Sequence, residues 1–210
     1  MTVAWLEVLV EEASMEIALE TLLPRIVPGT DFVIRRFNGK QDLLRKLPQR
    51  LSGYKQWVAT NQVALVVVTD RDDDDCHLLK RQLDDMADAA GIPRASVATS
   101  TAGVVLNRIA VEELEAWFFG DTAALVTAYP GVPETLATRA KFREPDDVKG
   151  GTWEALERVL QAAGHHRGGL AKIRAARDIS LHMDVESNSS QSFAAFRDGV
   201  RFVTRGKAVA

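Results

Sequence analysis

The stretch that decides the fold is Gln62–Asp75, QVALVVVTDRDDDD. It is aliphatic from Val63 to Val68, which is typical of a central strand in a parallel sheet with both faces covered. The run continues directly into Asp70–Asp75, where every residue except the second is aspartate. We therefore expect a buried strand that carries a dense group of carboxylates at its carboxyl end.

Strand-like and helix-like segments alternate around this stretch. Hydrophobic runs predict further strands at Val3–Val10, Asp31–Phe37, Ser96–Ser100 and Val104–Val111. Strands that alternate with helices are the signature of an α/β fold. The sequence therefore predicts a mainly parallel sheet of about four to five strands, flanked by helices.

Apolar residues at helical spacing predict the helices between these strands. A first helix is expected from Ser14, its N-cap, to Leu23, with Pro24 ending it. Further helices are expected over 41–51 and over Cys76–Ala90. Each of them connects two predicted strands, as a parallel sheet requires.

From residue 121 onward the pattern is helical, without clear strands. We expect residues 1–120 to form the α/β core and residues 121–210 to form a helical C-terminal extension that packs on it. The helices predicted in this extension are Thr122–Ala128, Pro133–Arg139, Thr152–Ala163, Gly169–Ile179 and Gln191–Val203.

Composition excludes several classes of protein. The 210 residues are 46% hydrophobic and 26% charged, which excludes a disordered or low-complexity chain. The longest apolar runs fall far short of the about 20 residues that a membrane span needs. The single cysteine, Cys76, allows no internal disulfide and suits a reducing compartment. We therefore expect a soluble cytoplasmic protein without a membrane partner.

Charge is distributed unevenly along the chain. Residues 149–210 contain 10 Lys and Arg against 6 Asp and Glu, whereas residues 1–148 contain 16 against 23. A uniformly basic nucleic-acid binder is therefore not expected. The distribution leaves open an acidic site beside a basic flank, or two simply solvated halves.

Carboxylates are expected to meet at the carboxyl ends of two strands. Glu11 follows the first predicted strand, and Asp70 and Asp72 follow the central one. In extended backbone, side chains two residues apart point the same way, and parallel sheets bind ligands at this edge. Carboxylates held this close repel each other unless a cation lies between them, and Mg²⁺ or Mn²⁺ suits oxygen ligands. A divalent ion at such a site suits phosphate chemistry.

Other acids near this edge allow two interpretations. Asp74 is a further candidate ligand, although one or two of Asp73, Asp74 and Asp75 also suit the N-terminus of the following helix. Glu112 and Glu115 begin a helix directly after a strand. Either they stabilise its first turn, or one of them completes a second metal position.

Basic residues could position a phosphate. Lys40 follows a predicted turn and is a candidate phosphate contact, although no GxxxxGK[ST] motif surrounds it. The basic residues Arg167, Lys172, Arg174 and Arg177 recur at helical spacing, so they either follow a phosphate backbone or face water.

The combined motifs resemble a known family. A strand that ends at Glu11 and a hydrophobic strand that ends in Asp70-x-Asp72 resemble the Toprim domain of topoisomerases, primases and OLD-type nucleases. More narrowly, the chain resembles the bacterial domain-of-unknown-function family 4276, which is placed among Toprim-like proteins. The segments that carry this likeness are EVLVEEASME, FNGKQDLLRKLPQRL, VVVTDRDDDDC, RIAVEELEAWFFGD and SQSFAAF.

The resemblance implies a Mg²⁺ ion at Glu11, Asp70 and Asp72, with the later EELE segment as an acidic supplement. It also implies an association with bacterial defence or DNA-processing systems and an AAA-type ATPase as a possible partner. Glu12 stands where Toprim domains usually have glycine.

Our leading hypothesis is a Mg²⁺-dependent phosphodiesterase, a nuclease that acts on DNA or RNA. In this hypothesis Glu11 holds a metal ion and acts as general base, Asp70 and Asp72 fix the ion, and Lys40 positions the phosphate backbone. The alternatives are a non-catalytic module that docks on an ATPase through its acidic pocket, and a phosphatase of small molecules.

Overall fold

The computed structural model describes residues 3, 5–96 and 103–205, and within them strand β3 (Val63–Asp70) lies inside a four-stranded sheet. Strands β1 (Trp5–Val10), β2 (Asp31–Arg36) and β4 (Val104–Ala110) complete this sheet. The strand order is β2-β1-β3-β4, and all neighbouring strands are parallel. Every residue of β3 is buried, as its uniformly aliphatic sequence predicts. The predicted α/β class with a parallel sheet is confirmed.

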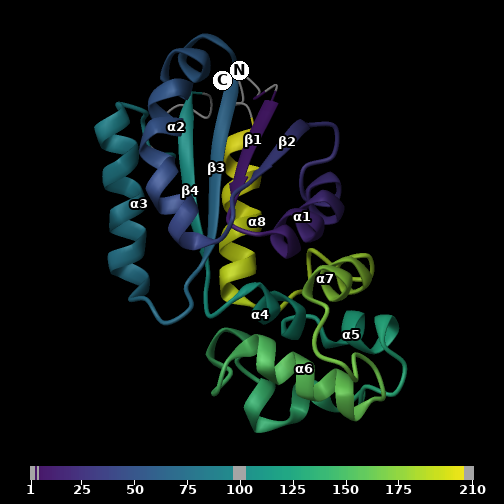
Figure 1. Ribbon diagram of the computed structural model, residues 1–210. Coiled ribbons are helices and arrows are strands. Elements are labelled where there is room, and N and C mark those ends of the chain that lie inside the picture. The colour runs from purple at the N-terminus through teal and green to yellow at the C-terminus, as the bar shows by residue number, and fades with distance from the viewer. Residues whose placement is uncertain (1–2, 4, 97–102, 206–210) are drawn as a thin grey trace.

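Helices cover both faces of the sheet (Figure 1). The connections between strands are α1 (Ala13–Ile26), α2 (Lys40–Thr60) and α3 (Cys76–Ala90). Helices α2 and α3 lie on one face, while α1 and the last helix, α8 (Gln191–Thr204), lie on the other. The sheet is thus the middle layer of three.

The alternation of side chains along each strand divides the core into two clusters. Val8, Val66 and Val68 pack with residues of α1 and α8. Leu65 and Val67 point to the opposite face and pack with residues of α2 and α3. A central strand such as β3 therefore needs an aliphatic residue at nearly every position, which explains its uniform sequence.

The segment between β4 and α8 is helical and lies beyond the carboxyl ends of the strands (Figure 1). Helix α8 then returns along the sheet, and the Trp117 ring contacts the rings of Phe193 and Phe196 at centroid distances of 5.3 and 5.1 Å. These aromatic contacts fix the helical segment over one end of the sheet. Its helices are α4 (Leu114–Phe119), α5 (Thr122–Ala128), α6 (Thr152–Ala162) and α7 (Lys172–Ser180), with 3-10 turns at Leu136–Thr138, Ala140–Phe142 and Pro145–Asp147.

Two predicted features of the first helix are wrong. Ser14 lies inside α1 rather than at its cap, and Glu12 is the residue that precedes the helix. Pro24 also lies inside α1 rather than ending it. Proline removes one N–H donor, but the buried Ile26 in the last turn packs into the core and offsets that loss.

Other boundaries differ as well. The predicted helix over 41–51 is only part of α2, which continues to Thr60 through Pro48. The predicted helix Pro133–Arg139 forms only a 3-10 turn, and the predicted strand Ser96–Ser100 falls largely outside the described residues. Among the helices that the structure describes, none is long and apolar enough to cross a membrane. The division of the chain near residue 120 stays a prediction.

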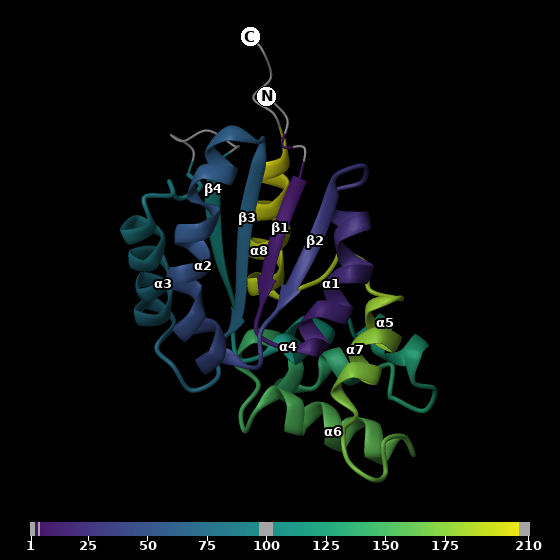
Figure 2. The same cartoon turned by 45° about the horizontal axis from the view of Figure 1, so that its top comes forward.

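The topology brings the carboxyl ends of β1 and β3 side by side at one end of the sheet (Figure 2). The chain leaves β1 through α1 to reach β2 on one side, and β3 pairs with β1 on the other side. In open parallel sheets, ligands bind outside the carboxyl ends of the strands at such a switch point. Here that point lies between the ends of β1 and β3.

Candidate functional site

Two acids occupy the switch point between β1 and β3. Glu11 comes directly after β1, and Asp70 is the last residue of β3. Both side chains are buried, with Glu11 5% and Asp70 3% exposed. The hydroxyl of Thr69 donates a hydrogen bond to Oε2 of Glu11 at 2.5 Å, which ties the two strand ends together. The structure therefore brings together the first two acids that the sequence predicts.

Asp70 is the most isolated charge of the site. Its Oδ1 is buried and has no hydrogen-bond partner among the described residues. Burial raises the pKa of Asp70 well above its usual value, and the nearby carboxylates of Glu11 and Glu115 raise it further. A carboxylate in this state is unstable without a cation beside it.

Glu11 is less isolated. Burial raises its pKa, although the hydrogen bond from Thr69 opposes this effect. The charge of Asp72 raises the pKa further, while the charge of Lys40 lowers it. These effects place Asp72 and Lys40 within electrostatic reach of Glu11.

Lys40 holds the acidic loop after β3. Its ammonium group contacts Asp72 at 2.7 Å and Asp74 at 2.8 Å, and it donates a hydrogen bond to the carbonyl of Arg71 at 2.8 Å. The three donors of the ammonium group thus have three acceptors. Lys40 must release one of them before it can contact a phosphate group.

One residue in the loop after β3 and one in the loop after β4 have an uncommon backbone conformation. Asp72 and Glu112 have φ of 48° and 63°, a region that residues other than glycine rarely adopt. The N–H of Asp72 donates to the carbonyl of Glu112 at 2.8 Å, and the Arg71 guanidinium forms an ion pair with the Glu112 carboxylate. Such backbone conformations are concentrated at binding and active sites.

The acids at the start of α4 have separate roles. Glu112 is engaged with Arg71, and Glu113 accepts hydrogen bonds from Thr152 and from the backbone N–H of Trp153, at the start of α6. Glu115 points inward, is 1% exposed, and has an Oε2 atom without a partner among the described residues. Of these acids, Glu115 is the one whose charge raises the pKa of Asp70.

Lys172 faces the acids from the helical segment. Its ammonium nitrogen lies 4.0 Å from Oε1 of Glu115 and 5.5 Å from the centre of the Trp153 ring. Burial lowers the pKa of Lys172, but the carboxylates of Glu115 and Glu12 outweigh that effect and raise it. Helical spacing identified Lys172 as one of several basic residues, and only its approach to Glu115 in the folded chain distinguishes it.

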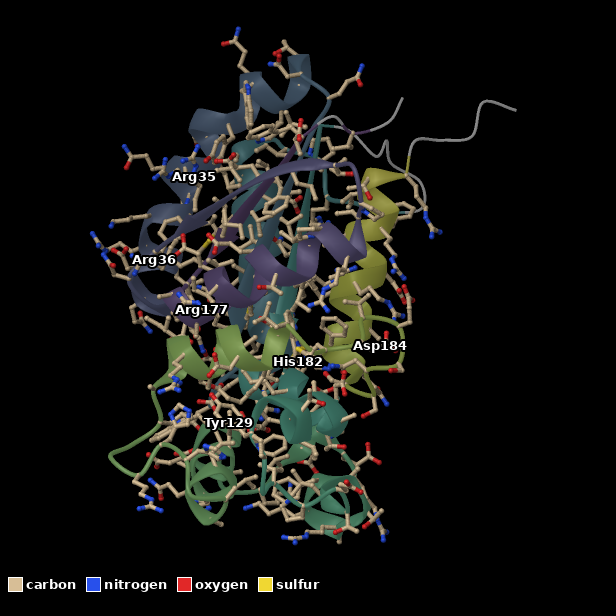
Figure 3. The ribbon with its side chains drawn as sticks, turned by 90° about the vertical axis from the view of Figure 1, so that its right-hand side faces the viewer. Arg35, Arg36, Tyr129, Arg177, His182 and Asp184 are labelled. Atoms are coloured by element: carbon tan, nitrogen blue, oxygen red, sulfur yellow. The ribbon has the colours of Figure 1, made fainter. Side chains whose placement is uncertain are left out.

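The other basic candidates lie elsewhere. Arg174 forms an ion pair with Asp178 at 3.4 Å, and Arg177 is exposed on the outer side of α7 (Figure 3). Arg167 lies in the loop before α7 and is exposed. None of these three side chains has a described contact with the acids at the switch point.

The structure confirms a helix-capping role for one acid of the run, Asp75. It is the N-cap of α3, and its side chain accepts hydrogen bonds from the N–H groups of His77 and Leu78, each at 2.9 Å. Asp73 is exposed. The run of aspartates therefore combines acids of the switch point with one acid that caps a helix.

Burial raises the pKa of Glu115 to about 7, while Lys172 opposes this effect. Lys172→Met is therefore expected to raise the midpoint of the Glu115 titration by about 1 pH unit. The reason is that a nearby opposite charge lowers a carboxyl pKa by roughly 1–3 units. Because the folded pKa lies above the usual 4.5, ionisation of Glu115 destabilises the metal-free protein increasingly from about pH 4.5 up to pH 7. NMR titration of ¹³C-labelled glutamate carboxyl groups measures the midpoint, with Arg177→Met as the control. An unchanged midpoint would contradict the proximity of Lys172 and Glu115.

The donor atoms fit a hard divalent cation, although they do not enclose one as they stand. In the described part of the chain, no three Asp, Glu, His or Cys side chains are arranged to hold a metal ion. However, Asp70 and Glu115 present buried carboxylate oxygens without partners. Such oxygens are the ligands that Mg²⁺ and Mn²⁺ prefer. The ammonium group of Lys40 compensates the charge of Asp72, which must turn from it to act as a ligand.

Comparison with known proteins gives one match. A family model described as Domain of unknown function (DUF4276) matches residues 10–201, which is most of the chain. No curated protein and no solved structure was found that matches the chain. The matched range contains all the acids described above.

Proposed function

This chain belongs to the family described as Domain of unknown function (DUF4276), and we propose that it is a nucleic-acid phosphodiesterase that requires Mg²⁺ or Mn²⁺. We call the carboxylates at the carboxyl ends of β1 and β3, with Glu11 and Asp70 at their centre, the acidic edge. In this proposal the acidic edge is a Toprim-like site, and the protein acts in a bacterial defence or DNA-processing system. The observation that carries the proposal is Asp70, a buried carboxyl group whose Oδ1 has no partner among the described residues and whose pKa the charges of Glu11 and Glu115 raise. Folding holds like charges together here at a cost that a bound cation would offset.

Glu11, Asp70 and Asp72 would hold the ion, and Glu115 could hold a second one. A divalent ion at this position stabilises the charge that develops on the phosphate group and favours ionisation of an attacking water. Burial raises the pKa of Glu11, which makes it a stronger base than an ordinary glutamate and suits it to accept a proton. Lys172 adds a positive charge on the side of the helical segment, where it can attract the phosphate backbone.

Burial favours this proposal over docking on an AAA-type ATPase through the acidic pocket. Glu11, Asp70 and Glu115 are each at most 5% exposed, so the surface of a docking partner cannot contact them directly. Only acids at the rim, such as Asp72 and Asp74, are about half exposed. A docking partner would therefore contact the rim and leave the buried charges unexplained.

The test is a cleavage screen with purified protein. Labelled single-stranded and duplex DNA and RNA are incubated with Mg²⁺, Mn²⁺ or EDTA, and p-nitrophenyl phosphate serves as a phosphomonoester. We expect cleavage of a nucleic acid that EDTA abolishes and that Asp73→Asn, a change at an exposed acid, leaves within about twofold. Turnover of the phosphomonoester alone would favour the small-molecule phosphatase. No turnover of any substrate, with binding to an ATPase that Asp72→Asn weakens, would favour the docking module.

A further inference from the structure

A groove runs along α2, on the side that faces β1 and the edge strand β2. It consists of two adjoining hollows of about 530 and 460 Å³, which share Arg50, Gly53 and Tyr54. Volumes of this size are typical of sites for small organic groups. We call it the α2 groove; besides the three shared residues, the residues that line it are Lys46, Gln49, Trp57, Trp5, Glu7 and Arg35.

A buried carboxylate organises the groove. Glu7, in the middle of β1, is 2% exposed. Its Oε1 accepts hydrogen bonds from the Tyr54 hydroxyl at 2.6 Å and from Nε of Arg35 at 2.9 Å, and its Oε2 accepts one from Trp5 at 3.3 Å. A carboxylate inside a strand is costly to bury. Here it fixes three side chains of the groove in one arrangement, which lowers the entropy cost of binding a ligand.

The exposed charges of the groove are mainly positive. Arg35, Lys46 and Arg50 are all exposed. Lys46 is paired with Asp42 and Arg35 with Glu7, whereas no described residue forms an ion pair or hydrogen bond with Arg50. Arg50 is therefore the cation most available to an anionic ligand.

Aromatic rings stand beside these cations. Tyr54 and Trp57 lie on one side of α2, with ring centroids 5.7 Å apart and planes inclined by 38°, and Trp5 is half-buried at the far end of the groove. Gly53 leaves open space between them, since a Cβ at this position would have no atom within 4 Å. Rings next to cations suit ligands that alternate planar bases with phosphates.

The α2 groove is also connected to the acidic site through α2 itself. Lys40, the first residue of α2, holds Asp72 and Asp74. At about 1.5 Å per residue, the stretch from Lys46 to Trp57 extends for about 16 Å away from that end. This length corresponds to several nucleotides of an extended strand.

We propose that the α2 groove binds single-stranded nucleic acid, with bases stacked on Tyr54 and Trp57 and a phosphate on Arg50, and that α2 directs the strand toward the acidic edge. The inference rests on the proposed function, because it names the form of nucleic acid that reaches that site. Hollows of this volume are large enough for single bases. Stacking on the two rings needs free base faces, which a single strand offers. In Figure 3, Arg35, Arg36 and Arg177 lie along the same side of the molecule.

The test is binding in EDTA, which separates the groove from metal-dependent cleavage. Fluorescence anisotropy measures the affinity for labelled DNA and RNA strands of about 15 nucleotides and for the corresponding duplex. We expect Trp57→Ala to weaken binding of the single strand about tenfold, through lost stacking. Arg50→Glu is expected to weaken it at least about tenfold and to reduce the salt dependence by about 1 unit of slope. Arg81→Glu, at an exposed arginine of α3 outside the groove, is the matched control and should stay within about twofold of wild type.

Three results would overturn the inference: no binding of a single strand to wild type at low salt, equal losses in Arg50→Glu and Arg81→Glu, or preference for the duplex. Arg50 is exposed, so its variant is expected to fold even if Trp57→Ala does not. Binding that depends on Arg50, without cleavage in Mg²⁺ or Mn²⁺, would contradict the catalytic proposal and support the groove. Equal affinity for the DNA and RNA strands would support recognition by stacking and phosphate contacts alone.

Discussion

Glu11→Gln is expected to lower the rate of metal-dependent cleavage about 10²–10⁴-fold, the usual contribution of a positioned general base. Glutamine keeps the shape of the side chain and can still accept the hydrogen bond from Thr69. It cannot accept a proton and is a weaker ligand for a hard cation. Single-turnover cleavage of a labelled strand, with protein in excess, measures the rate of the chemical step.

The matched control for Glu11→Gln is Glu16→Gln, which lies in α1 and forms an ion pair with Arg36 at 3.0 Å. We expect this control to cleave within about twofold of wild type. Full activity in Glu11→Gln would contradict the role of Glu11. An equal loss in both variants would point to a general effect of charge rather than to the site.

Asp70→Asn is expected to make the metal-free protein more stable. The fold raises the pKa of Asp70, so the ionised carboxylate is disfavoured in the folded state. The resulting destabilisation is absent below the unfolded pKa of about 3.9 and is complete only above the folded pKa. Replacing this unpartnered buried charge with a neutral amide should therefore raise the free energy of unfolding at pH 8 by at least about 1 kcal/mol. For a chain of this size that corresponds to an increase in Tm of about 2–4 °C.

Thermal unfolding in EDTA at pH 8 and at pH 4 measures this effect. The advantage of Asp70→Asn should be largest at pH 8 and smaller at pH 4, where Asp70 is protonated in the folded wild type. Added Mg²⁺ should raise the Tm of wild type but not that of the variant, because a ligand that binds the folded state stabilises it. A variant that is less stable than wild type at pH 8 in EDTA would show that Asp70 is satisfied without a cation.

The sequence was sufficient to predict the central sheet and its acidic edge. The run Val63–Val68 has the composition of a strand that is covered on both faces, and the parallel arrangement then brings Glu11 and Asp70 to one edge. These inferences needed only local composition and the rule that strand ends meet. The same local reasoning predicted a capping role for one or two of Asp73, Asp74 and Asp75, and the structure identifies Asp75 as the cap.

The remaining features depend on contacts between distant segments. The three acids at the start of α4 look equivalent in sequence, and only packing separates their roles. Glu112 forms an ion pair with Arg71, Glu113 caps α6, and Glu115 is buried. The extent of α1 was misjudged because burial of its last turn outweighed the effect of proline.

Lys172 and the α2 groove were hidden for the same reason. Lys172 lies near Glu115 only in the folded chain, and helical spacing alone does not distinguish it from its basic neighbours. Glu7 interrupts an aliphatic strand, but its partners Tyr54 and Arg35 come from α2 and β2. Sequence spacing carries no information on such pairings.

The central claim is that the buried carboxylates at the ends of β1 and β3 hold a divalent cation. Isothermal titration calorimetry with Mg²⁺ and Mn²⁺, on wild type and Asp70→Asn in parallel, tests it most directly. Binding to wild type that disappears in Asp70→Asn, and persists in Asp73→Asn, is the result that we predict. Absence of binding to wild type, or equal binding to wild type and Asp70→Asn, would contradict the claim and favour a docking role for the acids at the rim.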